Sequence, residues 1–261
     1  MEIDTTLGVL FDQVADLYDK ARPVYPEELF DELIKQVGLT ENAQILEIAP
    51  GTGQATLPLA RRGYKIVGVE LGRRLSEVAK KKLLLYPNAQ INNKSFEDVD
   101  LRERSFDLLY AATALHWIKQ EERFSKPHRL LKDDGFMAII GGAHISDGVG
   151  DKLFHATQPI YREYWASEKD GYHLKDLNEV KPMTFDERLF RFVEFKCFPR
   201  TISYTANAYC ELLNTESEKL ALPAEQREEF LEKIKKLIDK QFDGVAERKF
   251  ANSLLILKKR N

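Results

Sequence analysis

The sequence predicts an α/β fold, a doubly wound, seven-stranded, mainly parallel sheet with helices on both faces. Three observations support this prediction. Short apolar segments alternate with helical segments from residue 44 to residue 141. A glycine-containing loop follows the first apolar segment, as at the ligand-binding edge of such sheets. The chain has 261 residues, of which 43% are hydrophobic and 31% charged, which suffices for one domain carrying an insertion.

The alternating region is expected to contain five strands. They are Gln44–Ile48, Lys65–Glu70, Gln90–Asn93, Asp107–Ala112 and Gly135–Gly141. Three helices are expected between them, at Gln54–Arg62, Arg73–Leu85 and Gln120–Leu131. Since a helix follows most of the strands, right-handed crossovers would make this part of the sheet parallel.

The N-terminal forty residues are expected to be helical. Apolar residues recur at three- and four-residue spacing over residues 10–18 and 29–37. Pro23 and Pro26 force an extended break between these two helices.

After Gly142 the alternation lapses, and residues 151–191 are interpreted as an insertion after strand five with at least one helix. The pattern then predicts a sixth strand at Arg191–Arg200, a long helix at Ala224–Phe242 and a last strand at Lys249–Leu257. The long connection between the last two strands permits antiparallel insertion of the final one.

Bulk properties narrow the classes of protein. The net charge is −3 and the pI about 6.0, so no overall positive field favours nucleic acid. Cys197 and Cys210 are the only cysteines, which argues against a disulfide framework and favours a reducing cytoplasm. The sequence shows no cysteine or histidine spacing typical of a metal site and no signal peptide. It also shows no apolar run long enough to span a membrane. We therefore expect a cytoplasmic protein, monomeric or homodimeric, without metal, membrane or nucleic-acid partner.

The most informative segment joins the first strand to the helix that follows it. Glu47 lies near the end of that strand, and a small-residue loop through Gly51 and Gly53 comes next. The following strand ends in a second acid, Glu70, 17 residues after Gly53. A carboxylate at that position can accept hydrogen bonds from both hydroxyls of a ribose, so these residues predict a nucleoside ligand.

The loop distinguishes between two nucleoside cofactors. A dinucleotide-binding loop places a third glycine where this chain has Thr56, and a pyrophosphate would lie unfavourably beside the carboxylate of Glu47. S-adenosylmethionine (SAM) has no phosphate and carries an ammonium and a sulfonium, which a carboxylate favours. The loop therefore indicates SAM.

These motifs resemble those of the class I SAM-dependent methyltransferases, particularly the small-molecule branch that includes the trans-aconitate methyltransferases. The segment Glu47–Gly53 resembles the first motif of that family and Glu70 its ribose-binding acid. Four later segments are also similar, namely Ser95–Asp98, Ser105–Leu109, Ala114–Ile118 and Leu130–Phe136. At the two ends, the similarity includes Phe11, Ala15, Tyr18, Arg22–Pro26, Arg200 and Tyr204–Thr215.

The resemblance implies one domain over residues 1–261 with four parts. These are an N-terminal helical lid (1–40), a cofactor-binding core (41–142), an insertion or substrate lid (143–190) and the last strands and helices (191–261). It implies that the cofactor contacts residues of the lid, the loop and the strand ends, namely Tyr18, Arg22, Glu47, Ala49, Gly51, Gly53, Glu70, Leu71, Ser95, Phe96 and Ala112.

Two positions depart from the family pattern. Ala49 replaces the first glycine of the loop, which is tolerable where φ is negative. Ser95 stands where the family commonly has an aspartate for the adenine amino group, so adenine contact would fall to Phe96 and backbone atoms. Phe96 is as readily a core residue, and Arg22 is either a surface residue or the partner of the methionine carboxylate.

The acceptor side leaves several alternatives open. His116 could act as a general base or could only seal the cofactor pocket. Tyr161, Tyr164, Trp165 and Tyr172 of the insertion form either its own core or an aromatic substrate pocket. A carboxylate acceptor would need basic residues, for which Arg22, Arg162 and Arg188 are candidates.

The function predicted from the sequence is SAM-dependent methyl transfer to a small-molecule acceptor, a carboxylate being one candidate, by in-line displacement. A SAM-binding protein without turnover is the first alternative, because binding motifs do not determine a rate. A nicotinamide-dependent oxidoreductase is the second, and Thr56 counts against it.

Overall fold

A computed structural model describes residues 10–146, 151–165 and 174–261 of the chain. Its seven strands are β1 (Gln44–Ile48), β2 (Lys65–Glu70), β3 (Ala89–Asn93), β4 (Phe106–Ala112), β5 (Leu131–His144), β6 (Phe190–Thr205) and β7 (Val245–Lys259). They form one sheet in the order β3-β2-β1-β4-β5-β7-β6. Neighbours among β1 to β5 are parallel, whereas β7 runs antiparallel to both β5 and β6. The seven-stranded, mainly parallel sheet with an antiparallel last strand is confirmed.

The helices connect and cover these strands. In chain order they are α1 (Leu10–Gln13), α2 (Ala15–Ala21), α3 (Glu27–Val37), α4 (Thr56–Arg61), α5 (Arg73–Lys82), η2 (Leu115–Trp117), α6 (Glu122–Leu130), α7 (Lys152–Tyr164), η3 (Leu177–Glu179), α8 (Ala206–Leu213), α9 (Ser217–Leu220) and α10 (Ala224–Gln241). None of those in the described ranges has the length and apolarity needed to cross a lipid bilayer.

Alternating strand residues divide the core into two layers. On one face, Ile45, Tyr110 and Ile140 pack with Leu29 of α3 and Leu59 of α4. On the other face, strand residues pack with Leu115 of η2, Leu130 of α6 and the loop after β3. Burial of both sheet faces explains why the central strands are almost continuously apolar.

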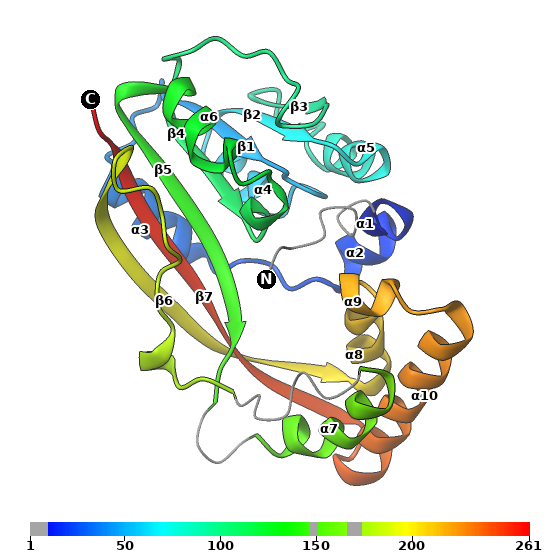
Figure 1. Cartoon of the computed structure of the whole chain (residues 1–261). Helices are drawn as coiled ribbons and strands as arrows, with labels where there is room; N and C mark the ends of the chain where they lie inside the picture. The colour runs from blue at the N-terminus through cyan, green and yellow to red at the C-terminus, as the bar shows by residue number, and fades with distance from the viewer. Residues whose placement is uncertain (1–9, 147–150, 166–173) are drawn as a thin grey trace.

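A third apolar cluster lies beyond the parallel part of the sheet. Strands β5, β6 and β7 extend past β4, and their far ends lie beside α7, α8 and α10 (Figure 1). This lobe is centred on Phe230 of α10, which is fully buried. These three strands are longer than expected because their outer halves pair with one another and pack against helices that the sequence pattern did not place there.

The aromatic residues of the insertion belong to this third cluster. The rings of Tyr161, Tyr164 and Trp165 each lie 5.1–5.4 Å from the ring of Phe230. Of the two alternatives left open, the core of the insertion is therefore correct for these three residues. Tyr172 lies outside the described residues.

Two helices differ from the prediction by more than their outermost one or two residues. The first helix divides at Val14, whose φ of −120° and ψ of 27° lie outside the helical range. The helix expected to reach Leu85 ends at Lys82, and Leu84 and Leu85 are exposed. Their apolar side chains extended the sequence pattern without contributing to the core.

Candidate functional site

The loop between β1 and α4 is held in an unusual backbone conformation. Gly51 and Gly53 have φ values of +59° and +78°, which glycine adopts at little cost. Ala49 also has a positive φ, +49°. The condition under which an alanine is tolerated there, a negative φ, is therefore not met, and the Ala49 amide donates to the carbonyl of Val69 on the neighbouring strand at 2.9 Å. The loop therefore retains a strained residue at the ligand edge of the sheet.

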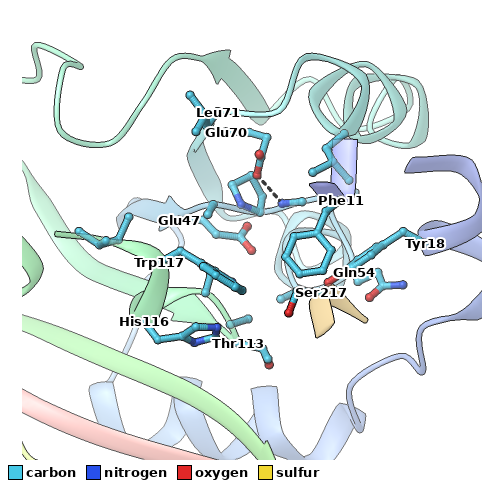
Figure 2. A pocket seen from close by; sticks show the side chains of 18 of the residues that line it. Phe11, Tyr18, Glu47, Gln54, Glu70, Leu71, Thr113, His116, Trp117 and Ser217 are labelled. Carbon is cyan, nitrogen blue, oxygen red and sulfur yellow. Dashed lines mark hydrogen bonds between the residues drawn. The ribbon is translucent and has the colours of Figure 1, made fainter. Parts of the chain in front are cut away.

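Glu70 joins the loop to the end of β2. Its Oε2 accepts a hydrogen bond from the amide of Gly51 at 2.8 Å, and its Oε1 accepts one from Gly72 at 2.7 Å. Burial raises the pKa of this carboxyl, and the two backbone hydrogen bonds oppose that change. Figure 2 shows the bond between Glu70 and the loop at the edge of the cavity. Glu70 thus fixes the loop while its carboxylate borders the cavity.

Glu47 is the second carboxylate of the site. It is fully buried at the end of β1, where its Oε2 accepts hydrogen bonds from Thr56 Oγ1 at 2.5 Å and from the hydroxyl of Tyr110 at 2.6 Å. Burial raises the pKa of Glu47 from 4.5 to about 7, although both hydrogen bonds favour the ionised form. Thr56, which argued against a dinucleotide, therefore holds this carboxylate in place.

A cavity of about 400 Å³ opens between these two acids and the N-terminal helices (Figure 2). This volume is in the range of small-molecule sites. Of the predicted cofactor and catalytic residues, those that line it are Tyr18, Arg22, Glu47, Ala49, Gly51, Glu70, Leu71, Ser95, Phe96, Ala112 and His116. Gly53 does not line it and instead donates its amide to the carbonyl of Pro50 within the loop.

The end of the cavity beside β3 is formed by Ser95 and Phe96. The Ser95 hydroxyl donates to Asp98 Oδ2 at 2.7 Å and accepts from the Asp98 amide at 3.0 Å, so it is engaged within its own loop. Phe96 is buried in the core and also lines the cavity, so its two interpretations are compatible. The ammonium of Lys126 lies 5.3 Å from the centre of the Phe96 ring.

Helix α1 covers the mouth of the cavity with an aromatic side chain. The ring of Phe11 lies 5.7 Å from that of Tyr18 and 5.6 Å from that of Trp117, both edge-on. Asp12, next in the chain, accepts a hydrogen bond at 3.0 Å from the amide of Leu75 in the first turn of α5. The lid is thereby attached to the cofactor side of the sheet.

Arg22 attaches the same lid to the opposite side. Its Nε donates to Thr215 Oγ1 at 2.8 Å, and its Nη2 donates to the Thr215 carbonyl at 2.7 Å. The guanidinium also lies 5.0 Å from the ring of Tyr18. Arg22 therefore lines the cavity, as expected, and its hydrogen bonds go to the segment after α8.

His116 lies in η2, beside Trp117 and facing the cavity (Figure 2). Burial lowers the pKa of His116 below 6.5, and the nearby charge of Arg123 lowers it further. The imidazole is therefore neutral at physiological pH and able to accept a proton.

Sequence reasoning missed the part of the cavity wall formed by α9 and the residue before it. The segment Glu216–Lys219 lines the cavity, and Lys219 forms an ion pair with Glu216 at 2.8 Å. Its ammonium lies about 5 Å from the rings of Tyr161 and Trp165, so the insertion supports this wall from behind. The wall is a four-residue helix without periodicity, which left no signal in the sequence.

Two of the three candidate arginines do not line the cavity. Arg188 is paired with Asp186 at 2.7 Å on an exposed turn. Arg162 lies on α7 and is absent from the residues that line the cavity. Arg22 alone of the three does so.

Comparison with known proteins relates this chain to methyltransferases. Residues 46–139 match the model of a methyltransferase domain. An uncharacterized methyltransferase of Schizosaccharomyces pombe is 31% identical over 128 residues, which cover 49% of each chain. Residues 46–139 therefore carry a methyltransferase domain, in agreement with the resemblance to the class I SAM-dependent methyltransferases.

Solved structures show the same fold. A protein from Anaeromyxobacter dehalogenans, provisionally described as a type II methyltransferase, aligns with a TM-score of 0.61 and 22% identity, over 92% of this chain and 97% of that chain. Phosphoethanolamine N-methyltransferase 2 of Haemonchus contortus, in complex with S-adenosylhomocysteine, aligns with a TM-score of 0.52 and 15% identity. The alignment covers 96% of this chain and 58% of that chain. The chain spans about half the length of the first curated relatives it matches.

The cavity fits SAM, the cofactor of this family. Glu70 at the tip of β2 offers carboxylate oxygens for ribose hydroxyls, and Glu47 offers negative charge near the loop for the ammonium or sulfonium. Phe96 and Leu71 supply apolar surface at the β3 end for adenine. The two carboxylates and the apolar surface together therefore match the chemical groups of an adenosyl amino acid.

Proposed function

We propose that this protein transfers the methyl group of SAM to a small-molecule acceptor by in-line displacement. The observation that supports it most directly is one cavity lined by Glu47, the Gly51 loop and Glu70 at neighbouring strand ends. When bound, SAM supplies a methyl group on a sulfonium, which is already a good leaving group.

The residues of the chain then have three tasks. Glu70 and the loop it fixes orient the cofactor. Phe11 and Trp117 exclude water at the mouth of the cavity, where their rings are in edge contact. His116 at the cavity wall accepts the proton of an acceptor that must lose one, since its imidazole is neutral.

A narrower hypothesis is that the acceptor carries a carboxylate. Two cationic side chains, Arg22 and Lys219, line the cavity among the described residues. Methylation of the carboxylate itself would need no base, so replacing His116 with Asn would leave the rate nearly unchanged. With a hydroxyl, thiol or amine acceptor, the same replacement would lower kcat by about a hundredfold.

The test combines binding with transfer. Calorimetry is expected to detect SAM and S-adenosylhomocysteine at micromolar concentrations, and methyl-labelled SAM is expected to label at least one member of a panel of small carboxylic acids, amines and alcohols. No heat with either compound would refute the proposal. Binding without transfer to any acceptor would favour the SAM-binding protein without turnover, and a thermal shift with NADH but not with SAM would favour the oxidoreductase.

A further inference from the structure

Three basic side chains project from one face of the extended strands beyond the SAM cavity. The strand register pairs His144 of β5 with Phe250 of β7, and Phe250 with Arg200 of β6. Arg248 lies two residues from Phe250 on the same strand. Since paired and alternate residues of antiparallel strands share a face, His144, Arg200 and Arg248 project from the same side of the sheet. Adjacent strands lie ~4.8 Å apart, so long side chains from all three strands reach a common space.

The linker between α2 and α3 lies beside this face, and in Figure 1 it is the blue segment that runs from α2 to α3. Arg200 Nη2 donates to the carbonyl of Val24 in this linker. Arg22, at its start, lines the SAM cavity. The linker is thus the boundary between the cavity and the basic face, and Arg22 belongs to both.

The positive charges here have no carboxylate partners. Within the described parts of the chain, Arg22, Arg200 and Arg248 form no ion pair, and their hydrogen bonds go to the neutral oxygens of Thr215, of Val24 and of the Tyr209 hydroxyl. Lys219, the next cation, is already paired with Glu216.

The charges are close enough to act on one buried group. Burial lowers the pKa of His144 to about 3, the charges of Arg248, Lys219 and Arg22 lower it further, and a hydrogen bond to the backbone of Lys249 opposes this change. The pKa of Tyr204 is raised by burial, while Arg200, Arg248 and Arg22 oppose that change. The carboxylate of Glu28 acts on Arg200 and that of Glu216 on Tyr204, so the charge of the three guanidiniums is only partly offset, and an anion bound between them would reduce their mutual repulsion.

Buried polar atoms without a partner lie on the same face. They are Nδ1 of His144, Nε of Arg200 and Oδ1 of Asn252, whose residue is paired with Gly142 and Phe198. Buried polar groups are nearly always hydrogen-bonded, so the donors among them are available to a ligand. Guanidinium groups bind oxyanions in particular, because they donate two parallel hydrogen bonds.

We propose that His144, Arg200 and Arg248, together with Arg22, form an oxyanion subsite that receives a carboxylate or phosphate group of the methyl acceptor. This inference rests on the proposed function, and it adds recognition residues that lie outside the cavity wall. A carboxylate and a phosphate monoester share the required chemistry, and the experiment distinguishes them.

The experiment is calorimetry on the full chain loaded with S-adenosylhomocysteine. The probes are succinate, inorganic phosphate and the neutral succinamide, at constant ionic strength. Succinate or phosphate is expected to bind, and the tighter of the two identifies the group, whereas succinamide gives no heat. Arg200→Gln and Arg248→Gln are each expected to weaken binding of that anion at least tenfold and to leave affinity for S-adenosylhomocysteine within twofold. The matched control is Arg191→Gln, since Arg191 is an exposed residue at the other end of β6.

Two results would overturn the subsite. One is no binding of either anion by the loaded wild-type protein, and the other is unchanged anion binding by both variants. If a variant does not fold, the imidazole nitrogen resonances of His144 in the wild-type protein replace it, and they are expected to shift with the anion and not with succinamide. Absence of S-adenosylhomocysteine binding would instead count against the proposed function, and the anion titrations would then be made on the protein alone.

Discussion

The cofactor side and the lid side of the cavity are built in different ways. On the cofactor side, Glu70 accepts from Gly51, only 19 positions away, and Glu47 accepts from Thr56, nine positions away. On the lid side, Arg22 donates to Thr215, 193 positions later in the chain. The first side is a local strand–loop–helix motif, whereas the second exists only when distant segments have come together.

The lid is also held by contacts that are more exposed. Helices α1 and α2 are attached to α5 by Asp12 and by the ion pair between Asp19 and Lys82. They are attached to α8 and its C-terminal end by Arg22 and by the exposed pair between Lys20 and Glu211. We therefore expect changes on the cofactor side to affect SAM binding strongly and changes on the lid side to affect it moderately.

The largest effect is expected from Glu70→Ala. This change removes a buried acceptor of two backbone amides as well as the carboxylate offered to the ribose. Loss of charged hydrogen bonds costs ~3 kcal/mol, so calorimetry should show SAM affinity reduced by about a hundredfold. Glu77→Ala, an exposed acid on α5 paired with Arg73, is the control and should bind normally. Normal SAM affinity in the Glu70 variant would show that this carboxylate neither binds the ribose nor holds the loop in the conformation that SAM requires.

The second effect concerns pH and Glu47. Its pKa in the folded protein is about 7, above the ordinary 4.5, so folding favours the protonated form and ionisation costs stability. The free energy of unfolding should therefore fall as pH rises from about 4.5 to about 7, and Glu47→Gln should abolish this part of the pH dependence. If SAM binds only the ionised form, its affinity should rise about tenfold between pH 6 and pH 8. A SAM affinity that does not change over this range in the wild-type protein would exclude Glu47 as the counter-charge.

On the lid side, Arg22→Met is expected to weaken SAM binding about fivefold. The variant keeps an unbranched apolar stem but loses both hydrogen bonds to Thr215, a net loss of ~1 kcal/mol. Lys20→Met, in the last turn of the helix that precedes Arg22, removes only an exposed ion pair and should change affinity by less than twofold. Equal effects of the two changes would show that closure of the lid does not depend on this contact.

The smallest effect is expected from Ala49→Gly. Since Ala49 has a φ of +49°, glycine removes steric strain there and should raise the free energy of unfolding by ~0.5 kcal/mol in denaturant titrations. Ala89→Gly in β3 has no such strain to relieve and should lower it by ~0.5–1 kcal/mol. A destabilised Ala49 variant would show that the methyl group makes packing contacts worth more than the strain.

The sequence predicted the central part of the molecule closely and the outer parts less well. Strands β1 and β2 begin and end at the predicted residues, because alternation of buried segments and helices is a local property. The outer ends of β6 and β7, residues 201–205 and 245–248, were missed, because they pair with each other rather than lying in the buried centre. All but one of the predicted cofactor residues line the cavity, since they follow from the loop motif or the family resemblance. The α9 wall was missed, because its four residues are brought to the cavity by α8 and α10.

The amino-acid sequence by itself determined the strand–loop–helix motifs, the positions of the two acids and the identity of the cofactor. Each of these features depends on residues that are close together in the chain. Only the tertiary structure decided that Arg22 bonds to Thr215, that Ala49 has a positive φ, and that Arg200 and Arg248 share a face with His144. The physical reason is that these features depend on strand register and on contacts between segments far apart in the sequence, which no local periodicity specifies.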